Sequence, residues 1–235
     1  MHLSVVIPAY NEEKRIEDTL SRMYDYLRAK DFDYEVIVVD DGSSDDTVPR
    51  ARESGLSREG KLKVVSNGEN RGKGYSVKSG MAASSGDHVL ICDADMSTPI
   101  EELDRLSAIA ASGYDIVIGS RAVEGADVRV RQPWYRERMG KVFNFFVKLL
   151  LMSDFRDTQC GFKLFRGDAA RDIAEDLKIE GFCFDVEMLY LAGKKGYKIR
   201  EEGVVWDNSP QSKVRIMGSS LNMFLDLVRI KRLHG

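Results

Sequence analysis

Runs of apolar, mostly β-branched residues recur along the first half of the chain, and a polar turn follows each of them. Uninterrupted apolar runs of this kind are typical of strands that are covered on both faces, as in a parallel sheet between helices. The pattern therefore predicts five buried strands. They cover residues 3–7, 34–39, 62–65, 88–92 and 115–118.

Helical spacing separates these runs. Apolar residues three or four positions apart occur over 16–27 and again over 100–109, where Pro99 precedes the first helical turn. A glycine-rich stretch leads into a further helix within 70–81. Strands that alternate with helices predict an α/β fold, in which a mostly parallel sheet is covered by helices.

In the second half of the chain, strands and helices no longer alternate regularly. The pattern predicts a long helix rich in apolar and basic residues at 134–152, a helix at 185–194 and a strand at 198–205, followed by an amphipathic segment at 217–233. The longest apolar stretch lies in the first of these helices, contains Lys148, and is shorter than the roughly 20 residues that span a bilayer. We therefore expect no transmembrane helix.

Length and charge narrow the class of protein. The 235 residues, of which 43% are hydrophobic, suffice for a single α/β domain over 1–235. The formal net charge of −3 argues against a nucleic-acid-binding protein. Cys92, Cys160 and Cys183 have neither metal-ligand nor disulfide spacing, which indicates a reducing compartment, and no leader is expected before the first strand.

Polar clusters follow four of the predicted strands, at 8–12, 40–45, 93–95 and 119–121. In an open parallel sheet, ligands bind beyond the carboxyl ends of the strands, so all four clusters are expected on one rim. Four acids in these clusters are expected to converge there and to raise one another's pKa unless a cation is present. They are Asp40, Asp41, Asp93 and Asp95.

Each cluster taken alone also fits a turn or a helix cap, and this reading accounts well for Asn11 and Thr98 as N-caps. It accounts poorly for four acids on one rim. Asp93 and Asp95, one residue apart at the end of a strand, suit a hard divalent cation that bridges a diphosphate. The rim is thus a candidate sugar-nucleotide site.

The same clusters carry a family resemblance. Together they resemble the motifs of inverting glycosyltransferases of the GT-A (Rossmann-like) fold, in that family's order. The motifs are VVIPAYNE at 5–12, VVDDGSSD at 38–45, NRGKG at 70–74, DAD at 93–95 and GSR at 119–121. Three further strings resemble the branch that makes dolichyl-phosphate glucose or mannose, and the first is most similar to the glucose-transferring members. They are DTQCGFKLF at 157–165, FDVE at 184–187 and SK at 212–213.

The resemblance implies transfer of a hexose from UDP-glucose or GDP-mannose to a polyprenyl phosphate with inversion. It implies that residues 1–121 form the half that binds the nucleotide sugar. Asp93 is implied to face the ribose or the sugar, and Asp95 to ligate Mg²⁺ or Mn²⁺. The residues implied to line the nucleotide-sugar site are Pro8, Ala9, Tyr10, Glu12, Asp40, Asp41, Lys73 and Asp93, and those implied in catalysis are Asp93, Asp95 and Arg121.

The charge of the implied acceptor predicts which residues should bind it. A polyprenyl phosphate is already an anionic nucleophile at neutral pH, so an enzyme for it needs cations to hold the phosphate rather than a carboxylate to deprotonate it. Residues 122–235 contain two basic segments interleaved with apolar residues, which predicts an acceptor half that faces the membrane. We expect a peripheral enzyme on the cytoplasmic face. The candidate phosphate ligands are Arg121, Arg136, Arg138 and Lys213.

Other functions remain open at this point. A glycosyltransferase with a saccharide or protein hydroxyl acceptor would need a base, for which Asp127, Asp157 and Asp185 are candidates. A non-catalytic nucleotide-binding protein is a further alternative, whereas a nucleotidylyltransferase is disfavoured because no glycine-rich loop follows the first strand. Ser97 stands where mannose-type members often have Gln, so a second metal ligand there stays open. The sequence does not determine the oligomeric state.

Overall fold

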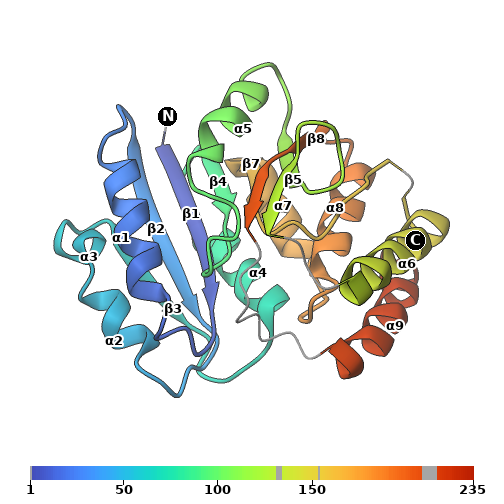
Figure 1. Ribbon diagram of the computed structural model, residues 1–235, viewed down its shortest axis with the longest axis horizontal. Coiled ribbons are helices and arrows are strands. Elements are labelled where there is room, and N and C mark those ends of the chain that lie inside the picture. The colour runs from blue at the N-terminus through green and yellow to red at the C-terminus, as the bar shows by residue number, and fades with distance from the viewer. Residues whose placement is uncertain (1, 131–133, 153, 208–215) are drawn as a thin grey trace.

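A computed structural model describes residues 2–130, 134–152, 154–207 and 216–235 of the chain. Its main element is a seven-stranded sheet in the order β3-β2-β1-β4-β7-β5-β8, with helices on both faces (Figure 1). Its strands are β1 (His2–Ala9), β2 (Asp33–Asp40), β3 (Leu62–Ser66), β4 (His88–Ile91), β5 (Ile116–Ser120), β7 (Lys163–Arg166) and β8 (Ile199–Gly203).

Six strands of this sheet run in the same direction. β1 pairs in parallel with β2 and β4, β2 with β3, and β5 with β8. β7 lies antiparallel between β4 and β5, so the second half of the chain completes the sheet that the first half begins. The predicted mostly parallel α/β sheet is confirmed. The carboxyl ends of β1, β2, β4 and β5 consequently share one rim, as predicted.

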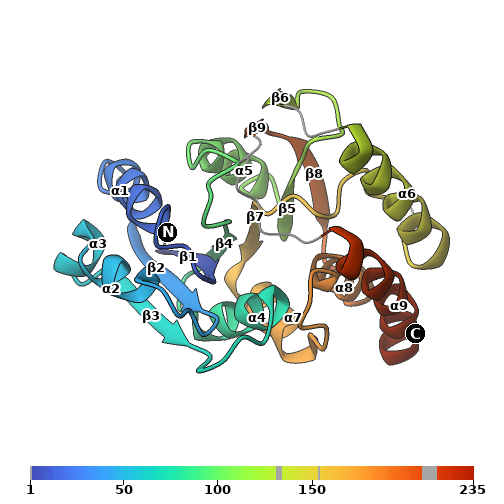
Figure 2. The same ribbon diagram turned by 60° about the horizontal axis from the view of Figure 1, so that its bottom comes forward.

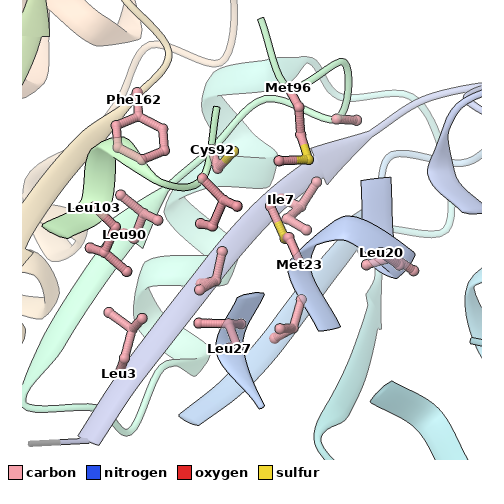
Figure 3. Close-up of a cluster of buried hydrophobic side chains, with 14 of the residues drawn as sticks. Leu3, Ile7, Leu20, Met23, Leu27, Leu90, Cys92, Met96, Leu103 and Phe162 are labelled. Carbon is pink, nitrogen blue, oxygen red and sulfur yellow. The ribbon is translucent and has the colours of Figure 1, made fainter. Parts of the chain in front are cut away.

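Two hydrophobic clusters fix the helices on the sheet. Along β1, Leu3 and Ile7 point to one face, and Val6 points to the other, as the period of two requires. Figure 3 shows the first cluster, in which Met23 and Leu27 lie against β1. The helices are α1 (Ile16–Leu27), α2 (Thr47–Arg52), α3 (Gly55–Arg58), α4 (Lys73–Ala83), α5 (Glu102–Ala110), α6 (Trp134–Leu150), α7 (Gly167–Asp176), α8 (Phe184–Lys194) and α9 (Ile216–His234).

The two basic, apolar helices α6 and α9 lie side by side at one end of the molecule (Figures 1 and 2). Phe146 of α6 packs edge-on against Phe224 of α9, with ring centroids 4.6 Å apart. The buried residues Phe143 and Val147 belong to a third cluster, shared with α8 and α9. The two helices therefore pack on each other and on α8 through this third cluster.

Several local features differ from the prediction. The strand expected at 198–205 is two strands, because β9 (Val205–Asp207) turns away to pair with β6 (Asp127–Val130). β7 lay within a string treated as a motif, and α2, α3 and α7 were not predicted either. α1 and α5 begin after Arg15 and Glu101, so neither Asn11 nor Thr98 is an N-cap.

Among the described residues, no helix is long and apolar enough to cross a bilayer.

Candidate active site

Hydrogen bonds between side chains and backbone amides join the loops after β1 and β2. Asn11, whose φ of 54° places it in the left-handed region, accepts a hydrogen bond from the Ser44 amide, while its own amide donates to Ser43 Oγ. The Glu12 amide donates to Thr47 Oγ1 over 2.7 Å. Asn11 thus links two strands at the rim instead of capping a helix.

The adjacent acids Asp40 and Asp41 are buried and hold these loops in shape. Asp40 Oδ1 accepts from the Ser43 amide. Asp41 accepts from the amides of Arg71 and Gly72, so it fixes the loop that starts α4. The structure therefore gives Asp41 a role in building the site, and contact of either acid with a nucleotide stays a prediction.

The start of α4 is pressed against a turn of the second half. Gly72 has a φ of 106°, and a Cβ there would overlap the carbonyl of Glu180. The amide of Gly74 donates to that same carbonyl over 2.8 Å. The fully buried Glu187 stabilises this turn, because its carboxylate accepts hydrogen bonds from the amides of Lys178 and Ile179. The same carboxylate contacts the His234 ring.

This packing brings Lys73 to the loop after β4. Lys73 Nζ lies 2.6 Å from Asp93 Oδ1, which makes a close ion pair. On the other side, a Cβ at Gly161 would overlap the Asp93 carboxylate. Asp93 is therefore held between the start of α4 and the loop before β7.

The ionisation of Asp93 follows from these neighbours. Burial by itself would raise the pKa of this carboxyl, but Lys73, with smaller contributions from Lys163 and Arg121, holds it below its usual range. Burial would likewise lower the pKa of Lys73, but Asp93 and Asp185 raise it above its ordinary value. Both partners of the pair are thus charged at neutral pH.

Two more ion pairs lie behind this one. Lys163 is fully buried, and its Nζ donates to Asp185 Oδ1 over 2.5 Å and to the Cys160 carbonyl. The Arg121 guanidinium grips Asp157 through Nε and Nη2, at 2.6 and 2.8 Å, and its amide donates to the same carboxylate. Opposite charges therefore alternate beneath the rim.

The four acids do not converge, contrary to the expectation from the sequence. Among the described residues no three His, Cys, Asp or Glu side chains are grouped to hold a metal. Asp40 and Asp41 bond to their own loops, and Asp93 pairs with Lys73. Each of these acids therefore has hydrogen-bond donors or a cation beside it.

Asp95 completes the Asp-Ala-Asp turn. Its Oδ1 accepts from the Ser97 amide over 3.0 Å, and its Oδ2 lies 4.0 Å from Nη1 of Arg15. Ser97 thus orients Asp95 through its backbone, and its carbonyl accepts from the Asp207 amide. Whether the Ser97 hydroxyl reaches a metal stays a prediction.

The predicted donor residues lie around the same rim. Pro8 and Ala9 form the last positions of β1, and Tyr10 and Glu12 follow in the loop. Of the predicted phosphate ligands, the structure describes the side chains of Arg121 and Arg138. Arg121 is engaged with Asp157, Arg138 is exposed and stacks 5.5 Å above Trp134, and the Arg136 side chain and Lys213 lie outside the described residues.

All three candidate bases for a hydroxyl acceptor are held in ion pairs. Asp127 pairs with Arg129 at the surface, and Asp157 pairs with Arg121. Burial would raise the pKa of Asp157, but Arg121 lowers it, which makes this carboxylate a weak base. Burial raises the pKa of Asp185, but the side chain is buried behind Lys163.

Residues that the sequence reasoning missed are mainly cations. Lys163 was assigned no role, although a lysine between Phe162 and Leu164 in an apolar run needs a buried partner. Arg15 lies outside the motifs and was assigned no role either. Gly161 gave no signal by itself, because its importance lies in the carboxylate that packs on it.

Comparison with known proteins places these residues in a family. The model described as glycosyl transferase family 2 matches residues 4–174. The chain belongs to glycosyl transferase family 2. All five rim motifs fall within the matched part, so the suspected glycosyltransferase family is confirmed.

Relatives of known name match almost the whole chain. The dolichyl-phosphate beta-glucosyltransferase of Drosophila melanogaster is 39% identical over 98% of this chain and 74% of its own length. The human protein of the same name is 36% identical over 99% of this chain and 76% of its own length.

A solved structure shows the same fold. Glucosyl-3-phosphoglycerate synthase of Mycobacterium tuberculosis, in complex with Mn²⁺, UDP-glucose and phosphoglyceric acid, superposes with a TM-score of 0.70 at 22% identity. The match covers 97% of this chain and 78% of that one. The predicted glycosyltransferase fold is therefore confirmed.

The partly buried pair Arg121–Asp157 yields a stability prediction. Asp157→Asn leaves the guanidinium without its charged partner and should lower the free energy of unfolding by about 3 kcal/mol at pH 7. Because the pKa of Asp157 is lowered in the folded protein, its contribution is present above the ordinary carboxyl pKa of about 3.9 and is lost as the pH falls through the lowered value.

Urea unfolding of both proteins at several pH values measures this difference. Asp127→Asn is the matched control, since it breaks an exposed ion pair and should change stability by less than about 1 kcal/mol. Equal stability of wild type and Asp157→Asn at pH 7 would contradict the assigned role of the pair.

Proposed function

We propose that this family 2 enzyme transfers glucose, with inversion, from UDP-glucose to the phosphate of a polyprenol such as dolichol. Relatives with this acceptor and this sugar match 98–99% of the chain. The residues of the rim supply the chemistry that the reaction needs. In this proposal residues 1–121 bind the donor, and residues 122–235 serve the acceptor.

The donor lies at the carboxyl ends of β1, β2 and β4. Pro8, Ala9, Tyr10 and Glu12, with Asp40 behind them, face the nucleoside. Lys73 and Asp93 lie next to the sugar and the diphosphate. Because Lys73 keeps Asp93 ionised, this carboxylate is ready to accept hydrogen bonds from the hydroxyl groups of a sugar or ribose.

The rim also fits a divalent cation. Mg²⁺ is commonly bound by one or two carboxylates together with the phosphates of a substrate, so a complete protein cage is not required. Asp95 is the proposed ligand, and its Oδ1 is oriented by the Ser97 amide. When bound, Mg²⁺ or Mn²⁺ would neutralise the charge that grows on the leaving diphosphate.

The acceptor assignment is carried by one observation: the three candidate bases Asp127, Asp157 and Asp185 are all committed to ion pairs. A hydroxyl acceptor would have no available base among them, whereas a phosphate acceptor needs none. Arg121 is the proposed phosphate ligand at the end of β5, with Arg136, Arg138 and Lys213 as further candidates.

The membrane surface is the proposed place of action. Val142, Phe145 and Leu149 lie on one exposed face of α6, and Leu225 and Val228 are exposed on the neighbouring α9. Basic side chains such as Lys141 and Arg229 accompany them. Apolar residues with a basic surround suit an anionic membrane interface. Three buried, unpaired cysteines suit the reducing, cytoplasmic side.

Glycolipid synthesis tests the proposed function. The protein is incubated with a polyprenyl phosphate and either UDP-glucose or GDP-mannose, with Mg²⁺ or Mn²⁺ or with a chelator. We expect glucose transfer from UDP-glucose in the presence of metal, and Asp95→Asn should lower kcat at least about a hundredfold because it weakens charge stabilisation in the transition state. Ser57→Ala, on the distant α3, is the control.

The outcome distinguishes the alternatives. Transfer to a free sugar or a peptide, without glycolipid, would favour the hydroxyl-acceptor reading. Nucleotide binding without any transfer would favour a non-catalytic protein.

Liposome sedimentation tests the membrane surface. Phe145→Asp together with Leu149→Asp should reduce binding to vesicles with anionic lipid at least about tenfold, since each exposed apolar side chain adds roughly 1.5–3 kcal/mol on burial. Arg52→Asp is the control, because Arg52 is exposed on α2 and lies outside α6 and α9. Unchanged binding of the α6 variant would refute this surface.

A further inference from the structure

Arg15 lies between two carboxylates of the donor site and has no role in the function proposed above. Its Nη2 is 2.5 Å from Glu12 Oε2, and its Nε donates to the same oxygen over 2.7 Å. Its Nη1 is 4.0 Å from Asp95 Oδ2. The side chains are only 14–20% exposed, so solvent screens these charges incompletely.

The position of Arg15 relative to Asp95 is fixed by two contacts of the chain. The Arg15 amide donates to the Glu12 carbonyl, which closes the turn before α1. One helical turn later, Thr19 Oγ1 donates over 2.7 Å to the carbonyl of Ala94, between the two acids of the Asp-Ala-Asp turn. α1 and the proposed metal loop are therefore held in register.

The two oxygens of Asp95 have different surroundings. Oδ1 is occupied by the Ser97 amide, and Oδ2 faces the guanidinium. A divalent cation that coordinates Oδ2 would approach to about 2.1 Å and would meet the positive charge of Arg15 at close range. Arg15 and the cation thus compete for the same carboxylate oxygen.

We infer that Arg15 is a positioning residue that neutralises Asp95 before the metal binds and thereby weakens metal binding until the diphosphate arrives. This inference rests on the proposed function only in that Asp95 is the metal ligand. When the negatively charged diphosphate is present, its charge offsets that of Arg15, and both cations can be retained. The metal and the donor are then bound together rather than in turn.

A purely structural role makes a different prediction. If Arg15 only fixes Glu12 and the loop before α1, its removal loosens the site and weakens the binding of Mn²⁺ and UDP alike. If the Arg15 guanidinium instead supplies a positive charge where the metal would bind, its removal strengthens Mn²⁺ binding because a repelling charge is lost. The same removal weakens the binding of UDP in the absence of metal because an attracting charge is lost. The two effects have opposite signs in one variant.

Titration with Mn²⁺, followed by the electron paramagnetic resonance signal of the free ion, tests this inference. In the absence of nucleotide, Arg15→Gln should bind Mn²⁺ about tenfold more tightly than wild type, because a repelling unit charge is removed at about 4 Å. Its affinity for UDP in chelator should fall by a similar factor. Arg15→Lys should stay near wild type. Arg22→Gln, exposed on the same helix, is the matched control and should also stay near wild type.

Equal or weaker Mn²⁺ binding by Arg15→Gln, including no binding by either protein, would overturn the inference. Thermal unfolding of each variant shows whether the fold is retained. The titration uses neither sugar nor lipid. Tighter Mn²⁺ binding by Arg15→Gln without glycolipid synthesis by wild type would therefore reject the proposed function and keep the inference.

Discussion

The ion pair between Lys73 and Asp93 is the interaction on which the rest of the site depends. It joins the start of α4 to the loop after β4, and both ends are held by the second half of the chain. The Glu180 carbonyl fixes the start of α4, and Gly161 packs on the Asp93 carboxylate. The proposed donor site therefore depends on contacts from both halves of the chain, although its motifs lie in the first.

A buried carboxylate stays ionised only if cations or hydrogen bonds offset the loss of water. Here Lys163–Asp185 and Arg121–Asp157 extend the arrangement beneath the rim, and the pKa of Asp93 stays low in spite of burial. This arrangement occupies Asp157 and Asp185, two of the three carboxylates considered as bases. It leaves Asp95, beside Arg15, as the acid best placed for a cation that arrives with a diphosphate.

Much of the fold could be predicted from the sequence, because buried parallel strands such as β1 and β2 are continuous apolar runs. β7 was missed because its four residues carry a buried lysine, whose partner Asp185 is 22 positions away. The rim was predicted correctly, but the convergence of its acids was not. The contacts of Asp41 with the Gly72 amide and of Asp93 with Lys73 depend on tertiary packing, which spacing along the chain does not encode.

The most direct test of this account is the position of Mn²⁺ in a crystal of the protein with UDP and Mn²⁺, located by anomalous scattering. We expect a single peak at about 2.1 Å from a carboxylate oxygen of Asp95 and in contact with the diphosphate, with Lys73 still paired to Asp93. A peak away from Asp95, or a diphosphate held by Lys73 and Arg15 with no Mn²⁺ peak beside it, would contradict the account.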